Sequence, residues 1–274
     1  MACAGVSTRE PGSTPVSRAS RSGIEIIGHR GNPVHFPENT LPSLLGAVAA
    51  GARSVEFDVR VAACGTPVLL HDATLDRTTD GSGSVEAFTL DELRELDAGS
   101  WFDPEFRETR IPSLEEALAA LLPPSPRGPG HRIHRIYAEL KGVRESGDLA
   151  RILERIRRTG TEDRVILISL DFELLLDLRA RGPELTLGYV AEDEGALADA
   201  LPLVRQDPRS ILDARQELLR AEPLRTTGWV EEGIRLVTWT VNEEAHAREL
   251  LALGIRRLTT DDPGGLLQGG SRGS

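Results

Sequence analysis

The chain has 274 residues, of which 39% are hydrophobic and 27% charged, a balance typical of globular proteins and too polar for a membrane protein. It carries 32 basic and 43 acidic residues, a net charge of −11, which argues against nucleic-acid binding because that relies on clustered Lys and Arg. The length exceeds an average domain, yet α/β barrels reach about 250 residues as one domain.

The first 23 residues are rich in Ser, Arg, Gly and Pro and lack an apolar run, so we expect a disordered N-terminal extension without a signal peptide. Residues 24–268 are expected to form one domain, followed by a flexible tail at 269–274. The two cysteines, Cys3 and Cys64, give no disulfide framework. We therefore expect a cytoplasmic protein with no stable membrane insertion.

The first predicted strand is the short apolar run in residues 24–31, which leads into two polar residues flanked by glycines, His29 and Arg30. A helix is expected next at 40–50, with Thr40 as its N-cap. This order of segments predicts a buried strand, followed by a polar loop and then a helix.

The second strand, Ser54–Val61, carries two carboxylates where apolar residues would be usual. Strand side chains alternate between faces, so Glu56 and Asp58 share one face. Such close like charges repel unless a cation lies between them, and carboxylate oxygens suit Ca²⁺ or Mg²⁺. Taken alone, the pattern is more often a strand with one solvated face. The metal interpretation depends on the polar residues that follow other strands.

A strand-like run at 67–72 ends in His71 and Asp72. The polar stretch 73–110 has no sustained pattern apart from a helical segment at 90–96. Long segments of this kind in compact domains are usually functional, so we predict a small insertion over the site.

From residue 111 onward, strands and helices alternate regularly. Ser113 and Glu116 form a capping box that opens a helix through Leu122, and the Pro/Gly-rich run at 123–130 ends it. Further strands are expected at 133–140, 165–170, 185–190, 210–212, 234–241 and 255–260. Helical patterns lie between them at 148–159, 172–181, 194–204 and 243–253, with an ambiguous one at 215–230.

With the runs that begin at 24 and 54, these segments make eight strands that alternate with helices. This alternation indicates parallel strands with crossover helices, and we predict an α/β fold, a TIM (β/α)8 barrel. An open doubly wound sheet is the alternative, but no G-x-G-x-x-G follows the first strand.

The active site of a TIM barrel lies at the carboxyl ends of its strands. The 133–140 strand ends with Glu139 and Lys141 on one face, the 234–241 strand carries Trp239, and the last strand leads into Asp261 and Asp262. Together with the earlier strands, this places three carboxylates, two histidines, an arginine and a lysine at one mouth.

These motifs resemble the glycerophosphodiester phosphodiesterase family, and the match covers nearly everything from about 24 to 267. The stretch 212–215 departs from the short polar motif that the family usually carries after its sixth strand. The matching segments are Gly28–Gly31, Pro37–Thr40, Glu56–Val59, Pro67–Asp72, Leu75–Thr79, Gly81–Val85, Ile111–Glu116, Glu139–Lys141, Trp239–Asn242 and Thr260–Pro263.

The resemblance implies hydrolysis of a small glycerophosphodiester to sn-glycerol 3-phosphate and an alcohol, through attack of the glycerol 2-hydroxyl and a cyclic phosphate. His29 and His71 would be the acid/base pair, and which one is the base in the first step is left open, as is the oligomeric state. The resemblance also implies that Glu56, Asp58 and Glu139 ligate the metal ion. Arg30 and Lys141 would bind the phosphate, and Trp239 would form an apolar wall beside the glycerol.

Residues near these groups receive weaker assignments. Glu38 is equally consistent with a contact to metal or glycerol and with a helix-entry role. Asp72 is expected to orient His71 or a neighbouring turn, whereas Asp261 and Asp262 are expected to be structural.

Two alternative functions stay open. A lysophospholipase D-like activity on lysolipids needs an apolar groove, for which the insertion offers Phe88, Trp101, Phe102 and Phe106 as scattered candidates. A noncatalytic barrel that binds phosphate esters would be favoured by the loss of a ligand or a histidine, and all are present.

Overall fold

The computed structural model describes residues 23–122 and 133–269. The expected N-terminal extension, the run at 123–130 and the tail beyond 269 lie outside these residues.

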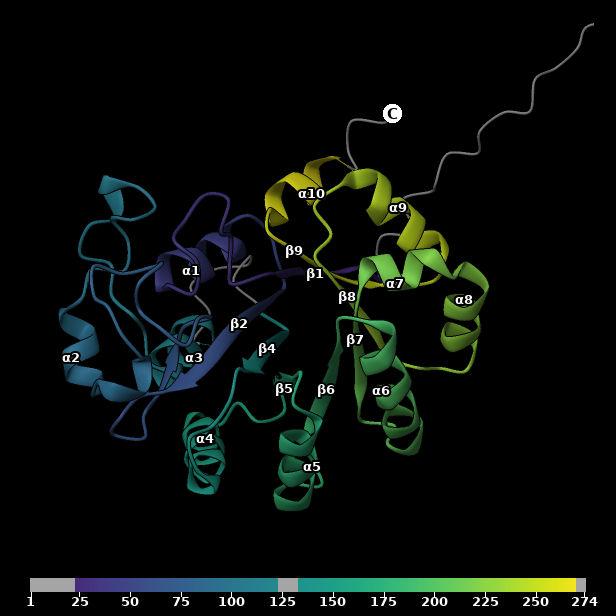
Figure 1. The fold of residues 1–274 in the computed structure, drawn as a ribbon. Helices are drawn as coiled ribbons and strands as arrows, with labels where there is room; N and C mark the ends of the chain where they lie inside the picture. The colour runs from purple at the N-terminus through teal and green to yellow at the C-terminus, as the bar shows by residue number, and fades with distance from the viewer. Residues whose placement is uncertain (1–22, 123–132, 270–274) are drawn as a thin grey trace, which may run out of the picture.

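Helices surround a central ring of strands (Figure 1). The ring strands are β1 (Glu25–Gly28), β2 (Ser54–Val61), β4 (Arg135–Leu140), β5 (Val165–Ser169), β6 (Thr186–Ala191), β7 (Ile211–Arg215), β8 (Leu236–Trp239) and β9 (Arg257–Thr260). The helices are α1 (Leu41–Ala49), α2 (Leu90–Glu95), α3 (Leu114–Leu121), α4 (Ser146–Thr159), α5 (Phe172–Arg181), α6 (Glu194–Gln206), α7 (Gln216–Ala221), α8 (Pro223–Glu231), α9 (Glu244–Ala252) and α10 (Pro263–Gly269).

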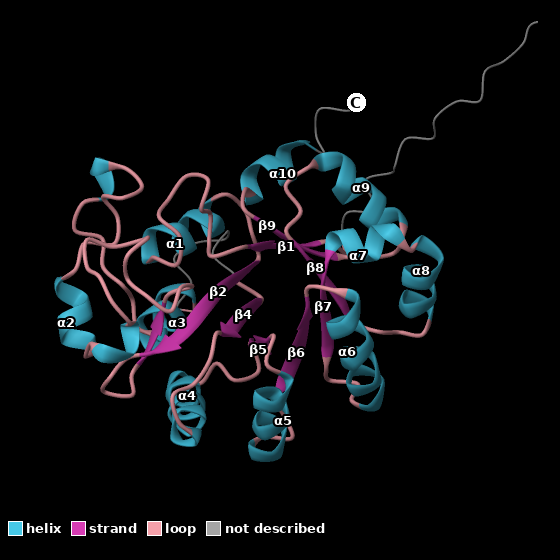
Figure 2. Cartoon of the chain, in the orientation of Figure 1, coloured by secondary structure: helices cyan, strands magenta, loops and turns pink. Residues whose placement is uncertain are grey.

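The ring is closed, because β1 pairs in parallel with both β2 and β9. Every other neighbouring pair in the ring is also parallel, and helices follow the strands around the outside (Figure 2). The predicted TIM barrel is therefore confirmed, and the doubly wound sheet is excluded.

A ninth strand, β3 (Pro67–Leu69), confirms the strand expected in the 67–72 run over its first three residues and lies outside the ring. It pairs antiparallel with the far end of β2, where Leu69 faces Val59. The Leu70 N–H then donates to the Asp58 carbonyl at 3.2 Å. β3 thus doubles back along β2 and returns the following residue, His71, to the level of Asp58.

The insertion at 73–110 packs against one side of the barrel (Figure 1), around a small apolar cluster that it shares with Ala62, Val68, Leu70 and Ile111. The expected helical segment is present as α2, which opens with a capping box between Thr89 and Glu92. Val85 and Leu93 are fully buried within the insertion. This core fixes the insertion as an ordered part of the domain.

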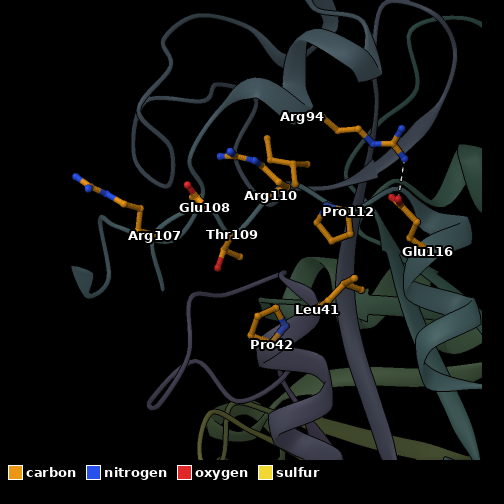
Figure 3. A pocket seen from close by; sticks show the side chains of 10 residues that line it. Leu41, Pro42, Arg94, Arg107, Glu108, Thr109, Arg110, Pro112 and Glu116 are labelled. Carbon is orange, nitrogen blue, oxygen red and sulfur yellow. Dashed lines mark hydrogen bonds and ion pairs between the residues drawn. The ribbon is translucent and has the colours of Figure 1, made fainter. Parts of the chain in front are cut away.

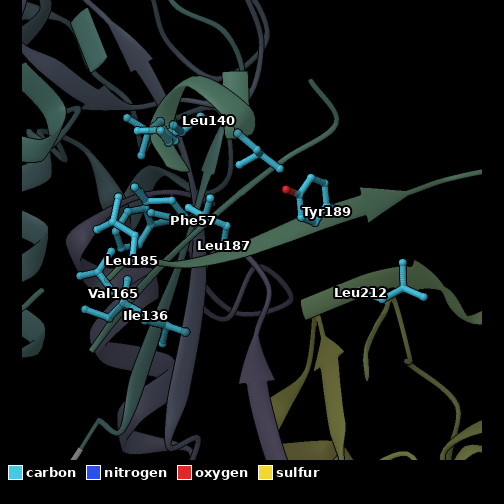
Figure 4. Packing of buried hydrophobic residues seen from close by; sticks show 14 of the residues in the cluster. Phe57, Ile136, Leu140, Val165, Leu185, Leu187, Tyr189 and Leu212 are labelled. Carbon is cyan, nitrogen blue, oxygen red and sulfur yellow. The ribbon is translucent and has the colours of Figure 1, made fainter. Parts of the chain in front are cut away.

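Two apolar layers determine where polar groups reach the mouth. The larger lies between the strands and the helices and contains Phe57 and Leu187 (Figure 4). The smaller fills the inside of the ring with Ile27, Tyr137 and Val237, among others. Since side chains alternate, the next position on the same inner face lies two residues nearer the carboxyl end. At these three strands, that position holds His29, Glu139 and Trp239.

Three further elements differ from expectation. β7 runs to Arg215 rather than ending at 212, so Asp213 also belongs to a strand. The ambiguous segment 215–230 forms two short helices, α7 and α8, that meet at Glu222. α10 was not expected. Within residues 23–122 and 133–269, no helix combines the length and apolarity needed to cross a bilayer.

Candidate active site

Three carboxylates meet at the mouth of the barrel, as the sequence predicted. Glu56 and Asp58 lie on the inner face of β2, and Asp58 is in register with Glu139 on β4. One oxygen from each carboxylate lies within 4.8 Å of the others. Glu56 and Asp58 are only 4% and 1% exposed, so water does not screen their mutual repulsion.

Two cations compensate part of this charge. Lys141 Nζ lies 2.6 Å from Glu139 Oε1 and 3.2 Å from Asp58 Oδ1, and Arg30 Nε lies 3.4 Å from Asp58 Oδ2. Burial favours the neutral form of Asp58, but Lys141 and Arg30 outweigh it and hold the pKa of this carboxyl below its usual range. Asp58 is therefore an anion fixed between two cations.

Glu56 lacks such compensation. Its Oε2 accepts the Arg30 backbone N–H at 2.9 Å, while its buried Oε1 has no hydrogen-bond partner among the described residues. Burial and the charge of Asp58 raise the pKa of Glu56 to about 8. Burial and Asp58 also raise the pKa of Glu139.

The donor set fits a hard divalent cation, because it consists of carboxylate oxygens alone. Glu56 Oε1 is buried without a hydrogen-bond partner among the described residues. A bound cation would also offset the charge of Asp58, which together with burial raises the pKa values of Glu56 and Glu139.

His71 is oriented by the residue that follows it. Its Nδ1 lies 2.7 Å from Asp72 Oδ1, and Arg77 binds the same carboxylate from the other side. The hydrogen bond from Arg77 is the largest effect on Asp72 and holds its pKa far below the usual range. An ionised carboxylate only accepts, so Nδ1 of His71 carries the proton and a neutral imidazole keeps its lone pair on Nε2.

His29 is oriented in the same way by Asp261, whose Oδ1 lies 2.6 Å from Nδ1. Asn242 Nδ2 holds the other oxygen of Asp261 at 2.7 Å. Burial lowers the pKa of His29, but the bond to Asp261 and the charge of Glu56 outweigh it, so the pKa lies above its ordinary value. The expectation that Asp261 is purely structural was incomplete, whereas Asp262 does accept the Gly265 N–H at the start of α10.

One wall of the mouth comes from β7 and β8. Trp239 is partly buried, and its Nε1 donates to the Asp213 carbonyl at 3.3 Å. The Arg215 guanidinium carbon lies 5.9 Å from the centre of the Trp239 ring, within reach of a cation–π contact. This wall is the part of the mouth where the sequence departs from the family pattern.

Sequence reasoning missed the carboxyl of Asp213. The residue is 4% exposed, and its Oδ1 has no hydrogen-bond partner among the described residues. Burial, with smaller contributions from Glu139 and Glu56, raises its pKa well above the usual range. The available signal was alternation, because Ile211 on the same strand faces the interior and Asp213 is the next position on that face.

Glu38 contacts two arginines, which the sequence did not indicate. Its Oε1 accepts from Arg30 Nη1 at 2.8 Å, and both of its oxygens accept from Arg77. The predicted N-cap of α1 is present, with Thr40 Oγ1 accepting the Ser43 N–H. Glu38 thus joins the site to the insertion.

A hollow of about 480 Å³ lies elsewhere, between the start of α1 and the end of the insertion (Figure 3). Leu41, Pro42 and Pro112 form part of its lining, and Arg94 at its edge is paired with Glu116 at 2.7 Å. It is lined by none of the carboxylates or histidines described above, so it is separate from the candidate site.

Comparisons with known proteins agree with this geometry. The model of the glycerophosphoryl diester phosphodiesterase family matches residues 29–265. A glycerophosphodiester phosphodiesterase from Caldanaerobacter subterraneus subsp. tengcongensis is 30% identical over 240 residues, which cover 87% of this chain and 94% of that protein.

Solved structures give the same result. A glycerophosphodiester phosphodiesterase from Agrobacterium tumefaciens superposes with a TM-score of 0.75 at 27% identity, covering 89% of this chain and 98% of that one. A phosphodiesterase from Oleispira antarctica, in complex with the product sn-glycerol-3-phosphate, superposes with a TM-score of 0.77 at 28% identity. The match covers 91% of this chain and 98% of that one.

Proposed function

The chain belongs to the glycerophosphoryl diester phosphodiesterase family, and on that premise we propose that it hydrolyses glycerophosphodiesters to sn-glycerol 3-phosphate and an alcohol. Its class is that of the phosphoric diester hydrolases. One observation carries the proposal, the two histidines that are each bound to an aspartate through Nδ1 beside a buried carboxylate triad. A barrel that only binds phosphate esters has no need of two oriented imidazoles.

A phosphodiester resists hydrolysis because its negative charge repels nucleophiles and its alkoxide leaving group is poor. Arg30 and Lys141 supply positive charge for the non-bridging phosphate oxygens. The Glu56, Asp58 and Glu139 carboxylates would hold Ca²⁺ or Mg²⁺, which when bound stabilises phosphate charge and makes a nearby hydroxyl more acidic.

The two histidines divide the proton transfers. His71, with its proton on Nδ1, offers the Nε2 lone pair as the base that takes the proton of the glycerol 2-hydroxyl. His29 has the raised pKa and acts as the acid that protonates the leaving alcohol oxygen. The 2-oxygen forms a bond to phosphorus as the alcohol leaves, and the roles reverse when water opens the cyclic phosphate.

The experiment uses purified protein on glycerophosphocholine, with sn-glycerol 3-phosphate measured enzymatically. We expect turnover to stop after treatment with a chelator and to return with Ca²⁺ or Mg²⁺. His29→Ala and His71→Ala should each lower turnover by about 10²- to 10⁴-fold. His246→Ala, on α9, is the matched control and should keep full activity. Full turnover after exhaustive chelation would contradict the metal requirement.

A nitrophenyl ester of glycerol phosphate tests which histidine is the acid. Its leaving group needs little protonation, so it should restore much of the activity of His29→Ala and little of that of His71→Ala. The reverse pattern would exchange the two roles.

A second candidate is hydrolysis of lysolipids, which one observation favours. Three of the four aromatic candidates in the insertion are not scattered, because the rings of Trp101, Phe102 and Phe106 form a chain of edge-to-face contacts that continues to Phe36. Phe36 lies on the loop that also carries Arg30, and Trp101 is 39% exposed. If an acyl chain lies there, Trp101→Ala should reduce turnover of a lysophospholipid and leave glycerophosphocholine turnover unchanged.

A further inference from the structure

Arg77, in the insertion, joins two carboxylates that come from different parts of the chain. Its Nε and Nη2 donate to Asp72 at 2.6 and 3.1 Å, and its Nη1 and Nη2 donate to Glu38 at 2.9 and 2.8 Å. Both contacts are two-pronged, which fixes the direction of each carboxylate as well as its charge.

Each of these carboxylates in turn holds a residue of the candidate site. Asp72 Oδ1 binds Nδ1 of His71, and Glu38 Oε1 accepts from Nη1 of Arg30 at 2.8 Å. The Arg77 guanidinium therefore contacts both the carboxylate that orients His71 and the carboxylate that binds Arg30.

We propose that Arg77 is a positioning residue, which sets the imidazole of His71 and the guanidinium of Arg30 in their working orientations at the same time. The inference rests on the proposed function. Without Arg77, the Asp72 and Glu38 carboxylates lose their common counter-ion and the two-pronged contacts that fix their directions. His71 would then no longer be held with its proton on Nδ1, and Arg30 would lose a fixed partner.

The exposure of Arg77 separates this role from a role in folding. Its side chain is 45% exposed, and ion pairs at that exposure contribute little to stability. A lysine cannot replace it, because an ammonium is a compact point charge that lacks the planar fork needed to bind two carboxylates at once. Loss of Arg77 should thus affect turnover far more than stability.

The experiment compares Arg77→Ala and Arg77→Lys with Arg94→Ala. Arg94 is a matched control, since it belongs to the same insertion, is 41% exposed and pairs with a single carboxylate, Glu116, outside the site. We expect Arg77→Ala to lower kcat by about 10- to 100-fold, the cost of a small misplacement of catalytic groups. Arg77→Lys should recover less than about a tenth of the lost activity. Arg94→Ala should keep wild-type kcat, and all three should unfold at similar urea concentrations.

Added guanidinium chloride provides the decisive readout. At concentrations well below those that unfold the protein, it should raise kcat of Arg77→Ala several-fold and leave Arg94→Ala unchanged, with NaCl as the ionic-strength control. A rise in kcat without a change in the urea midpoint separates positioning from a role in folding. An Arg77→Ala enzyme within twofold of wild type, or a loss matched by unfolding and not relieved by guanidinium, would overturn the inference.

A measurement without substrate keeps this inference distinct from the proposed function. The nitrogen chemical shifts of His71 report which ring nitrogen carries the proton. We expect the Nδ1–H form in the wild type and in Arg94→Ala, and a mixture of both forms in Arg77→Ala. If wild type turns over no glycerophosphodiester, the proposed function fails, while unchanged His71 shifts in Arg77→Ala refute the positioning role.

Discussion

Replacing Glu56 by glutamine should stabilise the metal-free protein, and increasingly so as the pH rises. The folded-state pKa of Glu56 is raised from 4.5 to about 8 by burial and by Asp58. Between these two values the unfolded chain has lost the proton and the folded one retains it, so the contribution of this group to stability falls as pH rises. Glutamine keeps an oxygen for the Arg30 N–H and never ionises.

The magnitude follows from the gap between the two pKa values. Linkage gives a destabilisation by Glu56 of about 1 kcal/mol at pH 5, about 3 kcal/mol at pH 7 and about 5 kcal/mol at pH 9. The advantage of Glu56→Gln should therefore grow by about 2 kcal/mol between pH 5 and pH 7, or roughly 4–8 °C in Tm for a chain of this size.

The assay is urea unfolding of chelator-treated protein at pH 5, 7 and 8.5. Glu154→Gln, the same substitution at an exposed position of α4, is the control and should follow the wild type at every pH. Added Ca²⁺ or Mg²⁺ should stabilise the wild type more than Glu56→Gln. If the stability curves of Glu56→Gln and wild type run parallel from pH 5 to 8.5, Glu56 titrates normally and the reasoning about its burial is refuted.

Three further outcomes are expected. Binding of Ca²⁺ or Mg²⁺ at pH 7 should release about one proton per ion, because Glu56 is then mostly protonated, and calorimetry in buffers of different ionisation enthalpy measures this. Asp213→Asn should raise the free energy of unfolding more at pH 8 than at pH 5, since the raised pKa of Asp213 makes its contribution fall as pH rises; equal gains in urea titrations would contradict it. Asp261→Asn should move the alkaline limb of kcat/KM to lower pH, because the carboxylate that raises the pKa of His29 is gone; an unmoved limb in the pH–rate profile would count against that pairing.

Much of the fold follows from local patterns in the sequence. Apolar runs alternate with helical spacing often enough to give eight strands, and parallel strands with crossover helices close as a barrel. The carboxylate triad was also predictable, because Glu56, Asp58 and Glu139 each break an apolar strand on the same face. These features are visible because strand periodicity is a property of a few neighbouring residues.

The run at 67–72 was expected as a strand beyond the eight of the barrel, and its direction was not predicted. The decisive quantity is the length of the connection. Only residues 62–66 separate β2 from β3, whereas a parallel neighbour needs a crossover of about a dozen residues or more. The short connection forces an antiparallel return, and that return is what carries His71 back to Asp58.

The partner of His29 lies 232 residues away in sequence, and no local pattern connects it to Asp261. Closure of the barrel does connect them. In a closed ring the first and last strands are neighbours, and here the His29 N–H donates to the Thr260 carbonyl at 2.9 Å. The residue after Thr260 must then lie beside His29. Once the barrel is predicted, a carboxylate directly after the last strand is a candidate partner for a histidine directly after the first, and Asp261 could have been assigned on that ground alone.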